Sequence, residues 1–308
     1  MLVAEFRSAV RGLVENRLDH AALKFLSAGA AERLDFSQPA GEPALVPPHS
    51  VSWRIFKNPV SLFIGGVAAV ILEFAEPRVR SGVWDHTNFR RDPVTRLKRT
   101  GLAAMVTVYG ARTVAEKMIA GVNRMHTRVT GVTPSGEPYS ASDPELLNWV
   151  QATAGFGFLE AYAAYVAPLS EADRDRYYAE GRTAARLYGA SGAPTSLAEQ
   201  RALFSVMAPR FEPSDIVLEF LSIMKKAPAF PQPAQLAQHS LVRAAVDIVP
   251  RQAREVLGLG RRYGLRPFEG RVVRRMARRA ERTMLRSGPA VQACLRLGLP
   301  EDYLYRSR

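Results

Sequence analysis

The chain has 308 residues, of which 47% are hydrophobic and 23% are charged, and its formal net charge is +13. This apolar content excludes an intrinsically disordered protein and is sufficient for a large buried core. The single Cys excludes a disulfide framework, a Cys-ligated zinc site and an iron–sulfur cluster. Residues 251–308 contain 15 Arg, no Lys and five acidic residues, so they carry +10 of the +13.

Two stretches in the first part of the chain bear on secretion and membrane insertion. Residues 1–7 have an acidic residue inside a short apolar run and no basic region before a long apolar stretch, so we expect no secretory signal. The most apolar window, 60–75, contains Ser61 and Glu73 and is shorter than the roughly 20 residues that span a membrane. It predicts a buried core helix, and we expect a cytoplasmic protein.

Helical patterns alternate with two irregular stretches. Residues 36–52 are rich in Pro and predict an irregular connector that is either ordered on the surface or mobile. Apolar residues at helical spacing over 114–129 predict a helix with one apolar stripe. The polar Gly-, Pro- and Ser-rich residues 131–144 predict a loop between two helices.

Further along the chain, several residues predict helix ends. Asp143 before Pro144, and the serines Ser170 and Ser196, are typical N-caps, and Gly189 predicts a helix end. We find no fixed-period repeat and few runs that alternate with period two. The sequence therefore predicts an all-α protein of about ten helices, forming one domain over 1–308.

Several catalytic motifs are missing from the sequence. None of the five His has a Glu three residues before it, which excludes the Glu-x-x-His pattern of di-iron bundles. There is no His-Glu-x-x-His, Gly-x-Ser-x-Gly or P-loop motif. The glycines of 258–264 are one residue too widely spaced for a dinucleotide fingerprint. We expect the lone Cys294 in the core, and no Cys-x-x-Cys-His motif could attach a haem covalently.

One pair of polar residues could bind an anion. Arg96 and Thr100 are four residues apart on a predicted helix, so their side chains share a face. Together they could hold a propionate, an oxyanion or bound dioxygen. The alternative is that Arg96 pairs with an acid such as Asp92, while Thr100 bonds back to its own helix.

Two histidines are candidate ligands. His126 borders the apolar stripe of 114–129, which suits a hydrogen-bonded core residue and also the proximal ligand of a b-type haem. His86 follows Asp85 at a predicted helix end or turn. It could contact a cofactor, or it could cap or bridge two helices.

Three ordered segments carry a resemblance to a known family. Residues 73–110, 123–153 and 169–189 resemble the family of the mycophenolic-acid pathway oxygenase MpaB and the rubber oxygenase called latex-clearing protein. The likeness spans roughly residues 50–220. It implies an all-helical, globin-like core around a non-covalent haem b, in which His126 binds the iron. The resemblance also matches Arg96 and Thr100 to an Arg-x-x-x-Thr pair near the haem, and it implies a glutamate base, either Glu73 or Glu76.

The chain departs from the family pattern at two positions. Gln151 follows Trp149-Val150, where many relatives have a His, and Arg99 stands where some rubber oxygenases have a Lys that ligates the iron reversibly. An Arg stays protonated and does not ligate iron. The missing secretory signal argues against extracellular rubber as the substrate.

These observations lead to two hypotheses for function. The first is a haem b-dependent oxygenase that acts with dioxygen on an apolar isoprenoid or lipid-like molecule. His126 would hold the iron, Arg96, Thr100 and His86 would surround it, and the aromatic residues Phe156, Phe158 and Tyr162 would line a pocket or simply fill the core. The second is a non-enzymatic binder of haem or another hydrophobic ligand.

The Arg-rich region predicts a basic amphipathic helix. Apolar residues at 272, 276, 280 and 284 step by four among seven arginines of 271–286. Such a helix could pack on the core with a solvated Arg face, dock at an anionic membrane surface, or bind nucleic acid. Few aromatic residues lie among the arginines, so we expect no specific nucleic-acid binding.

Overall fold

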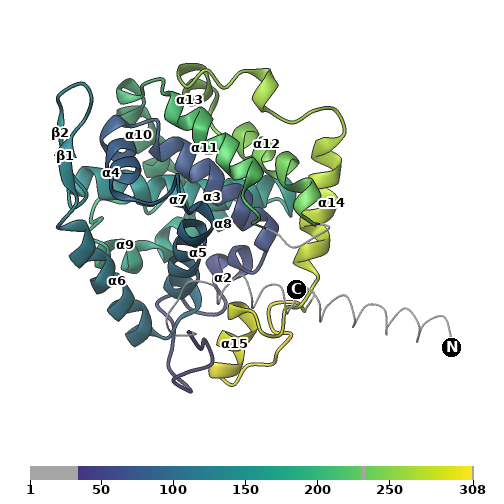
Figure 1. The fold of residues 1–308 in the computed structure, drawn as a ribbon. Helices are drawn as coiled ribbons and strands as arrows, with labels where there is room; N and C mark the ends of the chain where they lie inside the picture. Colours follow the sequence, from purple (N-terminus) through teal and green to yellow (C-terminus); the bar gives the residue numbers. More distant parts are fainter. Residues whose placement is uncertain (1–33, 230–233, 307–308) are drawn as a thin grey trace.

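The computed structural model describes residues 34–229 and 234–306, and the expectation about residues 1–7 lies outside these ranges. The described chain is helical, with one small hairpin (Figure 1), which confirms the all-α prediction. The helices are α2 (Val51–Phe56), α3 (Pro59–Glu73), α4 (Pro77–His86), α5 (Pro93–Tyr109), α6 (Arg112–His126), α7 (Pro144–Tyr165), α8 (Glu171–Glu180), α9 (Arg182–Leu187), α10 (Leu197–Met207), α11 (Asp215–Lys226), α12 (Gln238–Ile248), α13 (Arg251–Val256), α14 (Glu269–Glu281) and α15 (Pro289–Arg296). The hairpin pairs β1 (Thr130–Val132) with β2 (Pro138–Ser140).

The helices are shorter and more numerous than the expected ten or so. Local breaks divide what the sequence pattern suggests are longer helices: Gly181 separates α8 from α9, and Pro250 lies between α12 and α13. A Pro cannot donate a helical backbone hydrogen bond, and a Gly weakens a helix interior.

The predicted helix ends are present. Ser170 Oγ accepts a hydrogen bond from Asp173 N, and Ser196 Oγ accepts one from Glu199 N, each at 3.1 Å. Asp143 caps α7, which has Pro144 in its first turn. Gly189 follows α9 with a φ of +87°, a conformation that glycine adopts without steric cost.

The predicted core helix over 60–75 is α3, most of which is buried. α3 crosses α7 at Gly65 and Gly157: a Cβ added to Gly65 would lie 2.7 Å from the Gly157 carbonyl oxygen, and one added to Gly157 would lie closer still to that of Gly65. The two backbones are therefore in contact, which only glycine permits here. Two turns further along α3, Glu73 faces Thr153 of α7.

No single helix of the described ranges is long and apolar enough to cross a membrane. α3 and α4 satisfy the criteria for length and composition only when taken together, but the chain bends by 112° between them. Burial of α3 inside the helical core accounts for its apolar composition.

The Pro-rich connector is ordered and partly buried. Phe36, Leu45 and Val46 pack into the core, although the segment has no regular structure up to Ser50. The buried Arg296 of α15 holds this segment in place, since it donates to the backbone oxygens of Phe36, Glu42 and Tyr109 at 2.7–2.8 Å. Burial lowers the pKa of Arg296.

Two boundaries differ from the sequence prediction. α6 ends at His126, so the apolar stripe expected over 114–129 does not continue to Val129, and Met125 is 61% exposed. The loop expected over 131–144 contains the β1–β2 hairpin, whose turn is closed by a hydrogen bond from Thr133 N to Glu137 O.

Candidate functional site

Three ionisable side chains from three helices come close enough for their charges to interact. Glu73 ends α3, Arg96 lies near the start of α5, and His126 ends α6. The Arg96 guanidinium affects the pKa of both Glu73 and His126. The fold thus joins two residues of the predicted site, Arg96 and His126, to one of the two candidate glutamates.

Glu73 has an unusually basic carboxyl group. Burial raises its pKa to about 7, while the positive charge of Arg96 and the neighbouring Thr153 hydroxyl partly oppose this effect. A carboxyl group with such a pKa exchanges protons near neutral pH, which suits a general base.

Arg96 and Thr100 contact each other within α5. An Arg96 Nη1 donates to Thr100 Oγ1, and the Thr100 hydroxyl lies 3.0 Å from the backbone oxygen of Arg96. The back-bonding expected as an alternative for Thr100 is therefore present. Asp92 instead caps α5 through Thr95 N, so the carboxylate whose charge acts on Arg96 is that of Glu73.

His126 is a candidate ligand because of the state and surroundings of its ring. Burial and the positive charge of Arg96 lower its pKa, which favours the neutral imidazole. Its ring is not hydrogen-bonded to any residue in the described ranges. An imidazole nitrogen that is deprotonated and makes no other hydrogen bond can coordinate a metal.

Apolar side chains near these groups are only partly buried. The first thirteen residues of α5 include no fully buried side chain, and α6 buries only Ala115 and Ile119. The partly buried apolar residues of the two helices that pack against the core are Leu97, Leu102, Ala104, Met105, Val114 and Met118. Their accessible apolar surface could be covered by a hydrophobic ligand.

Glu76 has a structural role that distinguishes it from Glu73. Its carboxylate caps α4 by accepting from Val79 N at 2.8 Å, and it accepts from Arg78 Nε at 2.6 Å. Arg78 also donates to Glu145 on α7. Both Glu76 oxygens are therefore engaged in a buried network, which leaves Glu73 as the better candidate base.

His86 lies at the other end of α4 and contacts the hairpin. Its Nε2 is 3.1 Å from the Tyr139 hydroxyl of β2, and the two rings meet edge to face. This hydrogen bond matches the bridging role considered for His86. A cofactor contact by His86 stays a prediction.

Three aromatic residues considered as pocket lining pack within the protein. The Phe158 ring lies 4.9 Å from that of Phe56, and the Phe156 ring lies 5.1 Å from that of Phe204. Tyr162 is buried and donates to Glu281 of α14. Cys294 is also buried, and burial raises its thiol pKa to about 11, as suits a core residue.

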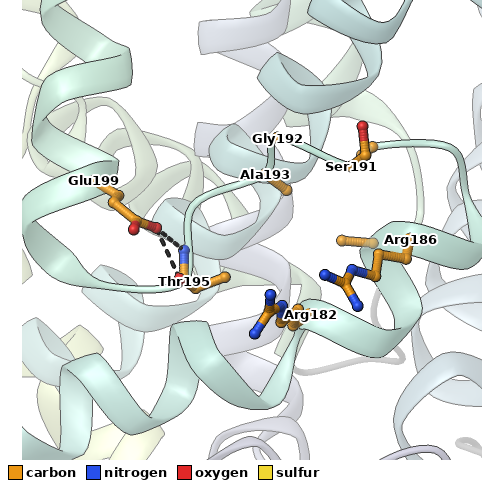
Figure 2. Close-up of a pocket in the computed structure, with 9 residues that line it drawn as sticks. Arg182, Arg186, Ser191, Gly192, Ala193, Thr195 and Glu199 are labelled. Atoms are coloured by element: carbon orange, nitrogen blue, oxygen red, sulfur yellow. Dashed lines mark hydrogen bonds between the residues drawn. The ribbon is translucent and has the colours of Figure 1, made fainter.

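A surface cavity of about 290 Å³ lies elsewhere, between α9 and the start of α10 (Figure 2). Arg182, Arg186 and Glu199 line it, and Glu199 accepts hydrogen bonds from Thr195. The lining is mostly polar, so this cavity does not suit an apolar substrate. None of the residues predicted for the site lines it.

Ion-binding clusters are also missing from the described ranges. No group of three or more His, Cys, Asp or Glu side chains is placed to hold a metal ion there. The Glu73, Arg96 and His126 group offers one imidazole and one carboxylate beside a guanidinium.

A family model described as ER-bound oxygenase mpaB/B'/Rubber oxygenase, catalytic domain, matches residues 53–282. The chain belongs to this family. The match runs from Trp53 in α2 to the end of α14, so it extends well beyond the 50–220 of the sequence resemblance and includes the Arg-rich helix. The chain is therefore an oxygenase-type enzyme. No curated protein and no solved structure matches it.

Sequence reasoning missed Thr153, the neighbour of Glu73. Its position follows from the close crossing of α3 and α7, because Gly157 and Thr153 are one turn apart on α7. The only signal in the sequence is the glycine at 157, and its partner Gly65 is more than ninety positions away.

Proposed function

We propose that this enzyme is a haem b-dependent oxygenase that acts on an apolar small molecule of isoprenoid or lipid-like character. The observation that carries the proposal is the grouping of Glu73, Arg96 and His126 beside partly buried apolar side chains of α5 and α6. An oxygenase catalytic domain needs a means of activating dioxygen, and this group is a suitable place for it.

The residues present fit a haem. Haem iron needs only one protein ligand, and His126 offers a neutral ring without a hydrogen-bonding partner in the described ranges. The Arg96 guanidinium could bind a propionate, and the accessible apolar surface of α5 and α6 suits a porphyrin face. A bare metal ion would need more protein ligands than this group supplies.

Each protein group has a distinct role in this proposal. Bound haem would supply dioxygen activation, which amino-acid side chains cannot. Glu73 would accept a proton from the substrate at a carboxylate oxygen, because its pKa near 7 keeps a useful fraction ionised. Arg96, held by Thr100, would stabilise negative charge that develops nearby.

The test is the absorption spectrum of the purified protein and of its histidine variants. We expect a Soret band in the protein supplied with haemin, its loss in His126→Ala, and its recovery when imidazole is added to His126→Gly. His239→Ala is the matched control, because His239 is exposed on α12 and lies outside the predicted site, and this variant should keep the band. A protein that stays colourless with haemin would refute the haem proposal, and loss of the band in His86→Ala alone would refute His126 as the ligand.

A second measurement separates an oxygenase from a non-enzymatic binder. Oxygen consumption with a panel of isoprenoid and unsaturated lipid substrates should be measurable and should fall strongly in Glu73→Gln. A haem protein that consumes no oxygen with any of them would favour a binding protein.

A further inference from the structure

Helix α14 turns a basic and apolar face toward solvent, away from the core. Val273 and Ala277 are fully buried and form its packed side. Phe268 and Val272 are 72% and 51% exposed, so the apolar stripe predicted through 272, 276 and 280 faces solvent at Val272, whereas Ala280 packs against the core. The residues of the outward side, which we call the docking face, are Phe268, Arg271, Val272, Arg275, Arg279 and Arg282.

Phe268 stands in an unusual backbone conformation at the start of α14. Its φ of +70° lies in the left-handed region, which a bulky side chain adopts only at a steric cost. The ring is largely exposed, so burial in the fold does not offset that cost. The Arg271 guanidinium lies 5.5 Å from the ring centre. The strained residue therefore presents an aromatic ring, next to a cation, at the protein surface.

The arginines of the docking face differ in their ion pairing from other arginines of the C-terminal region. Elsewhere in the C-terminal region Arg251 pairs with Glu255, and Arg306 pairs with Asp302. Within the ranges that the structure describes, Arg275, Arg279 and Arg282 form no ion pair. Figure 1 shows α14 along one edge of the molecule.

We propose that the docking face binds an anionic membrane surface. Arg271, Arg275 and Arg279 would contact lipid phosphate and carboxylate groups, while Phe268 and Val272 would enter the boundary between headgroups and acyl chains. Charge complementarity selects an anionic partner. The two exposed apolar side chains select a lipid surface over nucleic acid, because a phosphodiester backbone would leave them in water. This proposal is independent of the haem chemistry, although it would bring the enzyme to substrates that partition into lipid.

The first test is flotation of the full chain with phosphatidylcholine vesicles, prepared with and without phosphatidylserine. We expect binding only to vesicles that contain phosphatidylserine, and weaker binding at high salt, since ions screen the arginines. No flotation, or equal flotation with both kinds of vesicle, would overturn the proposal.

Substitutions then distinguish the contribution of the arginine charges from that of the apolar side chains that enter the membrane. Arg275→Gln with Arg279→Gln should weaken binding about fivefold per charge removed. Phe268→Asn should weaken it by roughly the same factor, and Asn tolerates the left-handed backbone. Val206→Ser is the control, because Val206 is 63% exposed on α10 and lies outside the docking face; it should bind like the parent protein.

Circular dichroism should show that all variants keep the helical content of the parent protein. Flotation unaffected by Phe268→Asn, together with tight duplex DNA binding that depends on the same arginines, would favour nucleic acid and overturn the membrane proposal.

Discussion

The helix pairs α3–α7 and α5–α6 are packed in opposite ways. At the crossing of α3 and α7 the backbones touch at Gly65 and Gly157, and the surrounding side chains are buried. In α5 and α6 most apolar side chains are only partly buried, and Gly101 has no atom within 4 Å of where a Cβ would lie. The first pair thus forms a rigid support, whereas the second leaves surface for a ligand beside the ionisable group.

The largest expected effect comes from breaking the tight pair. Gly157→Ala should destabilise the protein by about 3 kcal/mol, because the new methyl group forces α3 and α7 apart. Urea unfolding followed by circular dichroism measures the change. Gly66→Ala is the matched control, since the nearest atom there is a Phe158 ring carbon at 3.9 Å and the extra methyl group fits. If Gly157→Ala left the free energy of unfolding unchanged, this would contradict the close crossing of α3 and α7.

A smaller effect should appear as a pH dependence at Glu73. Its folded-state pKa, about 7, lies above the ordinary value of 4.5, so the native state prefers the protonated carboxyl group. The contribution of the protonated Glu73 carboxyl group to the free energy of unfolding is full below pH 4.5 and is lost as pH rises through 7. Glu73→Gln should therefore gain up to about 2 kcal/mol over the parent protein between pH 5 and 8, as measured by urea titrations.

The control for the Glu73 variant is the same substitution at the nearby Glu76. Glu76→Gln should destabilise the protein by about 2 kcal/mol, because an amide cannot accept from both Val79 N and Arg78 Nε. If the two variants respond to pH in the same way, the distinction between a proton-exchanging and a structural glutamate is wrong.

The smallest effect tests the loosely packed pair. Gly101→Ala should stabilise the protein by about 0.5–1 kcal/mol, since α5 gains helix propensity and no neighbour is displaced. A rise in the thermal midpoint measures this. Destabilisation would mean that some part of the protein packs against Gly101.

Features that depend on neighbouring residues were predictable from the sequence. The caps at Ser170 and Ser196 and the pairing of Arg96 with Thr100 each involve residues three or four apart. The all-α fold class was predictable for the same reason, because the helical spacing of apolar residues is visible within a short stretch of sequence.

Features set by long-range packing were not predictable. Apolar residues continue at helical spacing past His126, yet α6 ends there and the chain enters the hairpin. On α14, spacing alone selected a row that begins at Val272, which is 51% exposed, whereas the fully buried residues are Val273 and Ala277. The choice between Glu73 and Glu76 also required the fold, because the partners of Glu76 include Arg78, which in turn reaches Glu145 on α7.

The buried Arg296 limits how far this chain can be truncated and still fold. It joins backbone oxygens of Phe36, Glu42 and Tyr109, and all three lose their donor if the chain stops before α15. A fragment trimmed to the family match, 53–282, would lack both α15 and the segment that Arg296 holds. The two ends of the described chain thus close on each other, and we expect the smallest stable unit to reach from Phe36 through Arg296.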